Sequence, residues 1–147
     1  MNVRINADEF ARGMDAAAAE IVARLHQAVE LSCIEIENEA KARAPKADEH
    51  IGNDAPLRSS IAHKTAIDGA RSFGVVGTDN TYAAFVHEGT GIYSRTGMGR
   101  RDVPWAYKDA LGHWHQTSGN KAVPFLEDAV DVKRPRVLQI FQSILGG

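Results

Sequence analysis

Three histidines are the residues of this chain best suited to bind a metal ion. His113 and His115 flank Trp114, and on a β-strand this spacing directs both rings to the same face. His87 lies upstream beside Glu88, and three such ligands could hold zinc in an open site. A hairpin with histidines at its rim has the same pattern, and the chain contains no HExxH motif. A small metal-dependent hydrolase using His87, His113 and His115 is thus one hypothesis, but we favour surface histidines and expect no metal or cofactor.

Other catalytic patterns are weaker. Glu88 and His87 are an acid–base pair by type, yet the sequence identifies neither an orienting partner nor a substrate pocket. No serine lies in a GxSxG motif. The glycines of residues 90–99 match neither a Walker motif nor a dinucleotide fingerprint. We therefore predict no catalytic residues and a protein that is not an enzyme.

A glycine- and arginine-rich segment, residues 91–104, brings cations and aromatic rings together. The candidate interface residues in and beside it are Tyr93, Arg95, Arg100, Arg101 and Trp105. Arginines that pair with carboxylates could dock a neighbouring subunit. Aromatic rings between cations could also line a passage for DNA, and a flexible solvated loop is the third interpretation. We favour the subunit contact.

The elements that must position these residues begin with a long helix over residues 8–44. Apolar residues recur along it at spacings of three and four, which places them on one face. They are Val22, Leu25, Val29, Cys33, Ile36 and Ala40. Asp8 is the expected N-cap, and Pro45 ends the helix because a proline disfavours a helical residue before it. Cys33 is expected to be a small buried apolar residue.

Four strands are predicted next. Residues 57–67 and 72–77 form a hairpin, because Asp68-Gly69 is a strong turn signal. Residues 105–107 and 113–115 form a second pair around Gly112, with Trp105 and Tyr107 on one face. Together they predict one antiparallel sheet of about four strands.

Two further helices complete the prediction. Tyr82, Phe85 and Val86 have a helical spacing and are expected to pack a short central helix on the sheet, with Gly89 ending it. A final helix begins in its first turn at Pro124, carries Phe125 and Leu126 as anchors, and is expected to be interrupted at Pro135. The predicted architecture is a single α+β domain over residues 1–147.

Composition and charge limit the classes of function that this chain can have. The 147 residues suit one domain, and 44% hydrophobic with 24% charged residues is a globular balance. The formal net charge is −2, so no general cationic field attracts nucleic acid. Residues 1–54 hold 6 bases and 11 acids, net −5, and residues 55–147 hold 11 bases and 8 acids, net +3. Such a chain could stack head to tail with copies of itself, although a solvated acidic helix would give the same split.

Cysteine usage and hydropathy indicate the compartment. One cysteine excludes an internal disulfide framework. No apolar run is long enough for a membrane span, and residues 1–10 lack the apolar core of a secretory signal. We therefore expect a reducing, cytoplasmic environment and no membrane partner.

Several short motifs follow one another along most of the chain, from about residue 10 to 145. Ala44-Pro45 ends the long helix, and Leu57-Arg58-Ser59-Ser60-Ile61 follows it. Tyr82, Ala83, Val86, Gly89 and Thr90 form the next segment, and Pro124-Phe125-Leu126 begins the last helix. This ordered set resembles a family of small minor tail, tail-completion or head–tail joining (neck) proteins from long-tailed bacteriophages and prophages.

The resemblance implies a non-enzymatic virion structural protein that is assembled in the bacterial cytoplasm. Such a subunit would form a homo-oligomeric ring at the tail end or neck, where it contacts connector or stopper proteins and tail-tube or tail-terminator proteins. DNA would pass through the ring without being read. Heterologous contacts around a closed ring join different patches of neighbouring copies, which suits the uneven charge. The alternative of another class is a prophage-encoded adaptor or binding module.

Overall fold

The computed structural model describes residues 6–46, 57–109 and 111–146. Its helices are α1 (Ala7–Arg43), α2 (Leu57–Ser60), α3 (Ala83–Glu88) and α4 (Phe125–Leu145), with one 3₁₀ turn, η1 (Gly91–Tyr93). Its strands are β1 (Ala62–Asp68), β2 (Arg71–Gly77), β3 (Trp105–Lys108) and β4 (Trp114–Thr117). The predicted α+β class, with a long N-terminal and a C-terminal helix, is confirmed.

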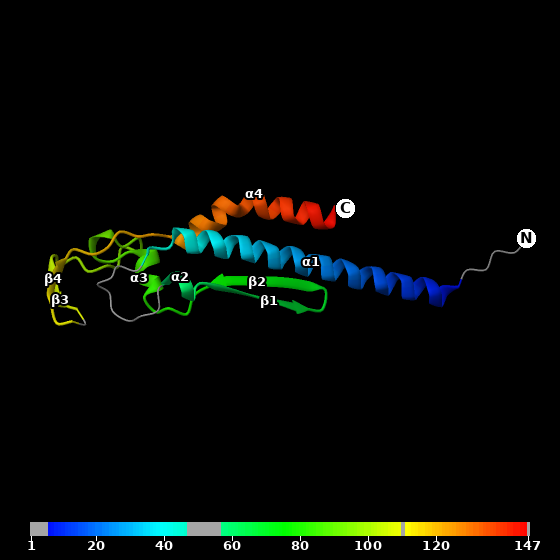
Figure 1. Cartoon of the computed structure of the whole chain (residues 1–147), viewed down its shortest axis with the longest axis horizontal. Coiled ribbons are helices and arrows are strands. Elements are labelled where there is room, and N and C mark those ends of the chain that lie inside the picture. The colour runs from blue at the N-terminus through cyan, green and yellow to red at the C-terminus, as the bar shows by residue number, and fades with distance from the viewer. Residues whose placement is uncertain (1–5, 47–56, 110, 147) are drawn as a thin grey trace, which may run out of the picture.

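The prediction of one four-stranded sheet is wrong. In the described part of the chain, β1 pairs antiparallel with β2 and β3 with β4, as two separate two-stranded sheets. Figure 1 shows the reason: α1 is a central layer between β1–β2 on one side and α4 on the other. The β3–β4 hairpin lies beyond the C-terminal end of α1, too far away to share an edge with β1–β2.

Local interactions define both ends of α1. The Asn6 side chain accepts hydrogen bonds from the backbone N–H groups of Asp8 (3.1 Å) and Glu9 (3.3 Å), so Asn6 is the N-cap and the expected cap, Asp8, is in the first turn. At the other end Ala44 has left the helical conformation (φ −57°, ψ 137°), as the residue before Pro45 is expected to do. The predicted helix is therefore confirmed to within a residue at each end.

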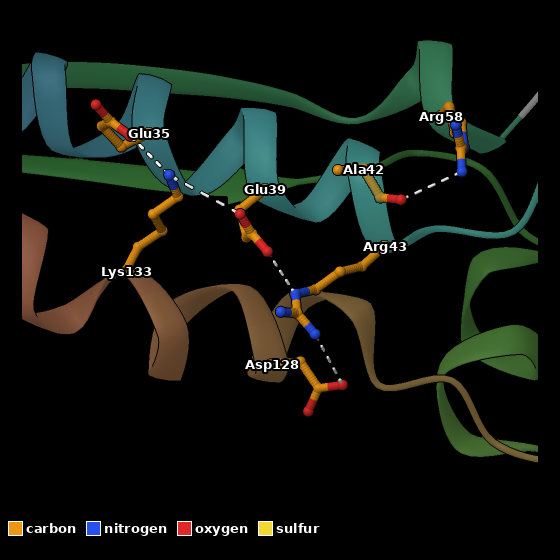
Figure 2. Close-up of polar contacts among 7 residues, drawn as sticks. All are labelled: Glu35, Glu39, Ala42, Arg43, Arg58, Asp128 and Lys133. Atoms are coloured by element: carbon orange, nitrogen blue, oxygen red, sulfur yellow. Dashed lines mark hydrogen bonds and ion pairs between the residues drawn. The ribbon is translucent and has the colours of Figure 1, made fainter.

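A chain of ion pairs follows the seam between α1 and α4 (Figure 2). Lys133 bridges Glu35 (2.9 Å) and Glu39 (3.8 Å), and Arg43 bridges Glu39 (2.7 Å) and Asp128 (3.9 Å). The hydrogen bond from Lys133, with a second from Arg136, holds the pKa of Glu35 below its usual value. Because residues late in α1 pair with residues early in α4, the two helices run antiparallel.

Small side chains on α1 let both neighbours approach closely. Ala28 and Ala40 are fully buried, and Ser32 is buried with its hydroxyl donating to the carbonyl of Ala28 (2.7 Å). Cys33 is buried as predicted, while the larger apolar residues of the predicted stripe are only half-buried. Gly74 of β2 is the matching small residue, since a Cβ there would lie 2.3 Å from Cys33 Sγ.

The main core lies at the C-terminal end of α1, where the four described helices meet. Its buried members are Ala40, Ala44, Leu57, Ile61, Ala83, Val86, Phe125 and Ala129. Phe125 is fully buried and Ile61 is 1% exposed, so the two largest core side chains are ones that the sequence identified. Leu126, Tyr82 and Val76 pack against this cluster from its edge.

The first predicted strand begins later than expected. Residues 57–60 form α2 and not β-structure, and the strand starts at Ala62. Arg58 explains the helix turn: its guanidinium donates to the carbonyls of Ala44 (2.7 Å) and Ala42 (3.2 Å), which are free at the end of α1. This contact, drawn in Figure 2, tethers the chain to α1 before β1 begins.

The predicted interruption of the last helix at Pro135 is also wrong. α4 continues from Phe125 to Leu145 through this proline, although a proline inside a helix removes one hydrogen bond and costs about 3 kcal/mol. Packing on both sides holds the two halves in line, because Ala129 and Ile140 are both buried. Pro124 itself is the N-cap residue, one position before the helical turn in which it was expected.

We expect the substitution Phe125→Ala to lower the free energy of unfolding by roughly 3–5 kcal/mol, because a fully buried aromatic ring is removed. Phe85→Ala is the matched control, since Phe85 is 58% exposed and its loss should cost no more than about 0.5 kcal/mol. Denaturant unfolding monitored by circular dichroism measures both. Equal effects of the two substitutions would contradict the placement of Phe125 at the centre of the core.

We expect Gly74→Ala to destabilise the fold by roughly 1–3 kcal/mol, because the new methyl group collides with Cys33 Sγ and crowds Val29. Gly77→Ala in the same strand is the control, since a Cβ there meets nothing within 4 Å. Adding Cys33→Ala to Gly74→Ala should recover part of the loss in thermal unfolding. If Gly74→Ala and Gly77→Ala behave alike, β2 does not lie this close to α1.

Candidate functional site

The end of the molecule beyond α1 holds most of the predicted site residues. Here α3, η1, residues 94–104 and the β3–β4 hairpin lie together (Figure 1). α3 is entered through Asn80, whose side-chain oxygen accepts a hydrogen bond from Tyr82 N (2.8 Å). It ends at Gly89, whose φ of 73° favours glycine and where a Cβ would lie 2.8 Å from two backbone atoms. The predicted short helix and its stop at Gly89 are therefore confirmed.

Phe85 departs from the prediction that it packs α3 on a sheet. Ala83 and Val86 are the α3 residues that face the core, and the Val86 carbonyl accepts a hydrogen bond from Val123 N (2.9 Å). Phe85 is 58% exposed and lies on another side of this short helix. A single turn of helix has one buried face, and the residue before Val86 is rotated away from that face.

The glycine- and arginine-rich segment is held at its start by backbone hydrogen bonds. Thr90 N donates to Asn120 O (2.9 Å), Ile92 N to Ser118 O (3.2 Å) and Arg95 N to Glu88 O (2.9 Å). The Thr90 hydroxyl accepts a further bond from Asn120 N (2.9 Å), which is a role for the threonine of the predicted motif. Residues 90–95 therefore lie against residues 118–120, and the segment for which a flexible loop is one interpretation is anchored at this end.

Two of the five candidate interface residues line a common groove. The Arg100 guanidinium lies over the Trp105 ring, 5.3 Å from its centroid, which is cation–π geometry. Both residues line a groove of about 420 Å³ between α3 and the start of β3. Phe85 and Met98 also line it and are 58% and 87% exposed. We call these four residues, Phe85, Met98, Arg100 and Trp105, the tip groove.

The other three candidates lie apart from the tip groove. Arg95 makes an ion pair with Glu127 at the start of α4 (2.8 Å), which raises the pKa of Arg95 and lowers that of Glu127. Arg101 donates weakly to Gly97 O (3.5 Å) and lines a smaller cavity of about 160 Å³. Tyr93, in η1, is 43% exposed. Arg100 therefore contacts Trp105, Arg95 contacts α4, and Arg101 lines a separate, smaller cavity.

The three histidines of the metal hypothesis do not come together. His113 and His115 both lie on Asp109, whereas His87 contacts Glu88 (3.0 Å) and the edge of Phe125. Among the residues that the structure describes, the group able to hold a metal is His87 with Glu88 and Glu127. The Arg95 guanidinium already neutralises Glu127 in that group. The three histidines of the metal hypothesis therefore do not form one site among the described residues.

Asp109 organises the turn of the second hairpin, and the sequence reasoning missed it. Its Oδ1 accepts hydrogen bonds from Leu111 N (2.9 Å) and His113 N (2.8 Å), and its Oδ2 lies 2.8 Å from His115 Nε2. His115, and then the backbone N–H of His113, lower the pKa of Asp109 to about 2. An aspartate four residues before a histidine at a Gly112 turn was the available signal.

The β3–β4 hairpin is partly covered on one face and exposed on the other. Trp105 and Tyr107 share one face as predicted, where Tyr107 stacks on His115 at 5.3 Å. On the other face Trp114 is 71% exposed and Lys108 lies 5.8 Å from its ring centroid. A two-stranded hairpin alone is marginally stable, so the turn contacts of Asp109 carry much of its order.

The opposite end of the molecule is also uncovered. Every residue from Asn6 to Ile21 is exposed, although this part of α1 carries apolar side chains. Phe10 is 68% exposed, Met14 58% and Ile21 56%. These turns were not identified as a surface from the sequence. None of the described helices is both long enough and apolar enough to cross a membrane.

Comparisons with protein-family models, with curated proteins and with solved structures found no match to this chain.

We expect the order of the second hairpin to depend on ionised Asp109. Because folding lowers its pKa from an ordinary 3.8 to about 2, its stabilising effect is complete above pH 3.8 and is lost as the pH falls through about 2. Fluorescence of Trp105 and Trp114, the two tryptophans of the chain, measures this transition. Asp109→Asn should disorder the hairpin turn at neutral pH and so remove the acid transition. Asp102→Asn, at a carboxylate that is 96% exposed, should leave both unchanged. An unchanged acid profile in Asp109→Asn would contradict this role.

Proposed function

We propose that this chain is a non-enzymatic structural subunit of a bacteriophage or prophage virion, acting in tail completion and head–tail joining. In this role it forms a homo-oligomeric ring at the tail end or neck. Its partners are connector or stopper proteins and tail-tube or tail-terminator proteins, and DNA passes through the ring without being read. The ring is assembled in the bacterial cytoplasm and is then part of the virion.

The observation that carries this proposal is the fully exposed stretch of α1 from Asn6 to Ile21. At 1.5 Å per residue it projects about 22 Å beyond the rest of the fold. Isolated helices of this length are marginal in water, and this one also exposes Phe10, Met14 and Ile21. A protein built to act alone gains nothing from such an extension, whereas a subunit covers it on assembly.

The uncovered hairpin at the other end supports the same role. Trp114, Leu111 and Met98 are each more than 70% exposed, which is unusual for large apolar side chains of a monomer. The motif residues Leu57, Ile61, Val86 and Phe125 are buried, so they build the scaffold that carries the two ends. In this proposal the ordered sequence motifs build the fold, and the two ends of the molecule make the partner contacts.

We expect the purified chain to form closed rings that are visible by negative-stain electron microscopy and that have a single mass by light scattering. Raising the salt concentration should shift these rings toward monomers, because contacts between opposite charges at an exposed surface are screened. In cells that carry the gene within a prophage, its deletion should yield separate heads and tails. Intact infectious particles without this gene product would contradict the proposed function, and recovery with a host protein alone would favour the adaptor alternative.

A further inference from the structure

Three metal-ligating side chains meet where α3 ends and α4 begins. His87 and Glu88 are the last two residues of α3, and Glu127 is in the first turn of α4. One ligand atom of each, a ring nitrogen or a carboxylate oxygen, lies within 4.8 Å of the other two. A backbone hydrogen bond from Val123 N to Val86 O (2.9 Å) joins the approach to α4 to the end of α3. We call His87, Glu88 and Glu127 the α3–α4 cluster.

His87 is the most firmly held member of the α3–α4 cluster. Its side chain is 15% exposed, and its ring lies edge-on to the ring of Phe125 with the centroids 5.5 Å apart. Its Nδ1 lies 3.0 Å from Glu88 Oε1. The buried Phe125 ring and the Glu88 carboxylate thus fix the imidazole from two directions. A ligand that is already ordered loses little conformational freedom when an ion binds, which favours binding.

The donor set of the α3–α4 cluster suits zinc. Zn²⁺ binds imidazole nitrogen and carboxylate oxygen at about 2.0–2.2 Å, so tetrahedral ligands lie about 3.4 Å from one another. Glu88 and Glu127 are 40% and 54% exposed, and rotation of their side chains closes the remaining distance. The imidazole favours zinc and neighbouring transition metals over magnesium or calcium, which prefer oxygen ligands alone. Two carboxylates also match the charge of one divalent ion, and three protein ligands leave a fourth position for water.

Arg95 is the cation that such an ion has to displace. Its guanidinium donates to Glu127 Oε2 (2.8 Å), and its backbone N–H donates to Glu88 O (2.9 Å). The side chains of the ion pair are 42% and 54% exposed, and exposed pairs of this kind are weak. A divalent ion carries twice the charge and gains three ligands at once. The backbone hydrogen bond does not involve the guanidinium, so the segment stays anchored when the Arg95 side chain is released.

We propose that the α3–α4 cluster binds a divalent transition-metal ion, with Zn²⁺ as the best match, in exchange for the Arg95 guanidinium. This site replaces the set of three histidines considered from the sequence, and it goes beyond the proposed function without depending on it. Ion binding then frees the Arg95 side chain within residues 91–101, which contain two further arginines and no acid. The positive charge displayed by this segment therefore increases when the metal is bound.

Calorimetric titration of the untagged full chain with zinc chloride tests the site. We expect one ion per chain, and Co²⁺ in its place should give the visible absorption of tetrahedral coordination. Glu127→Gln and His87→Gln should each weaken binding at least about tenfold, because each removes a ligand. His115→Gln is the matched control, since this histidine lies in the β3–β4 hairpin on Asp109, and it should bind as the wild type does. Binding that survives both ligand substitutions, or that is lost in His115→Gln alone, would overturn the proposal.

The Arg95→Gln variant tests the exchange directly. Removing the competing guanidinium should tighten zinc binding at least about threefold, whereas a site in which Arg95 helps to order the ligands would bind more weakly. Arg101→Gln, in the same segment, is the control and should leave the affinity unchanged. Zinc should also raise the thermal unfolding temperature of the wild type and of Arg95→Gln, but not that of Glu127→Gln. An affinity that is unchanged or lower in Arg95→Gln, with the variant folded by circular dichroism, would overturn the exchange.

Discussion

The close approach of α1 to two different neighbours is the constraint on which the rest of this structure depends. Alanines and Ser32 are buried along the C-terminal half of α1. At Gly74 of β2 there is no room for a side chain, because Cys33 of α1 lies against this position. Larger residues would hold the layers apart and expose Phe125. The ion pairs between α1 and α4 are half-exposed, so they select the antiparallel register of the helices more than they stabilise it.

A mismatch in length follows from this arrangement. α1 has 37 residues, whereas α4 has 21 and each strand of the first hairpin has seven. The partners therefore cover only the C-terminal half of α1, and the remainder projects as an acidic helix with apolar anchors. At the other end, a small hairpin and an arginine-bearing groove extend beyond the core. The acids of residues 8–20 and the arginines of residues 95–101 therefore lie at opposite ends of the molecule.

Several elements were predictable because their signals are local. Pro45 ends α1 by a steric effect on the preceding residue, and Gly89 ends α3 because its positive φ excludes most side chains. Other predictions failed where a distant contact decides the outcome. Arg58 draws residues 57–60 into a helical turn by reaching the carbonyls of α1, and burial of Ala129 and Ile140 keeps α4 continuous through Pro135. No local pattern contains either contact.

The candidate site divides in the same way. By itself the sequence determined that Arg100 and Trp105 belong to a cationic, aromatic segment, that Phe125 and Val86 build a core, and that the charge is uneven, because residue types and short spacings are properties of the chain alone. Only the tertiary structure decided that Phe85 faces a groove, that His87 lies away from His113 and His115, and that Phe10, Met14 and Ile21 have no cover. Those outcomes depend on which elements come to lie against one another, and that is determined by the packing of α1 between its two neighbours.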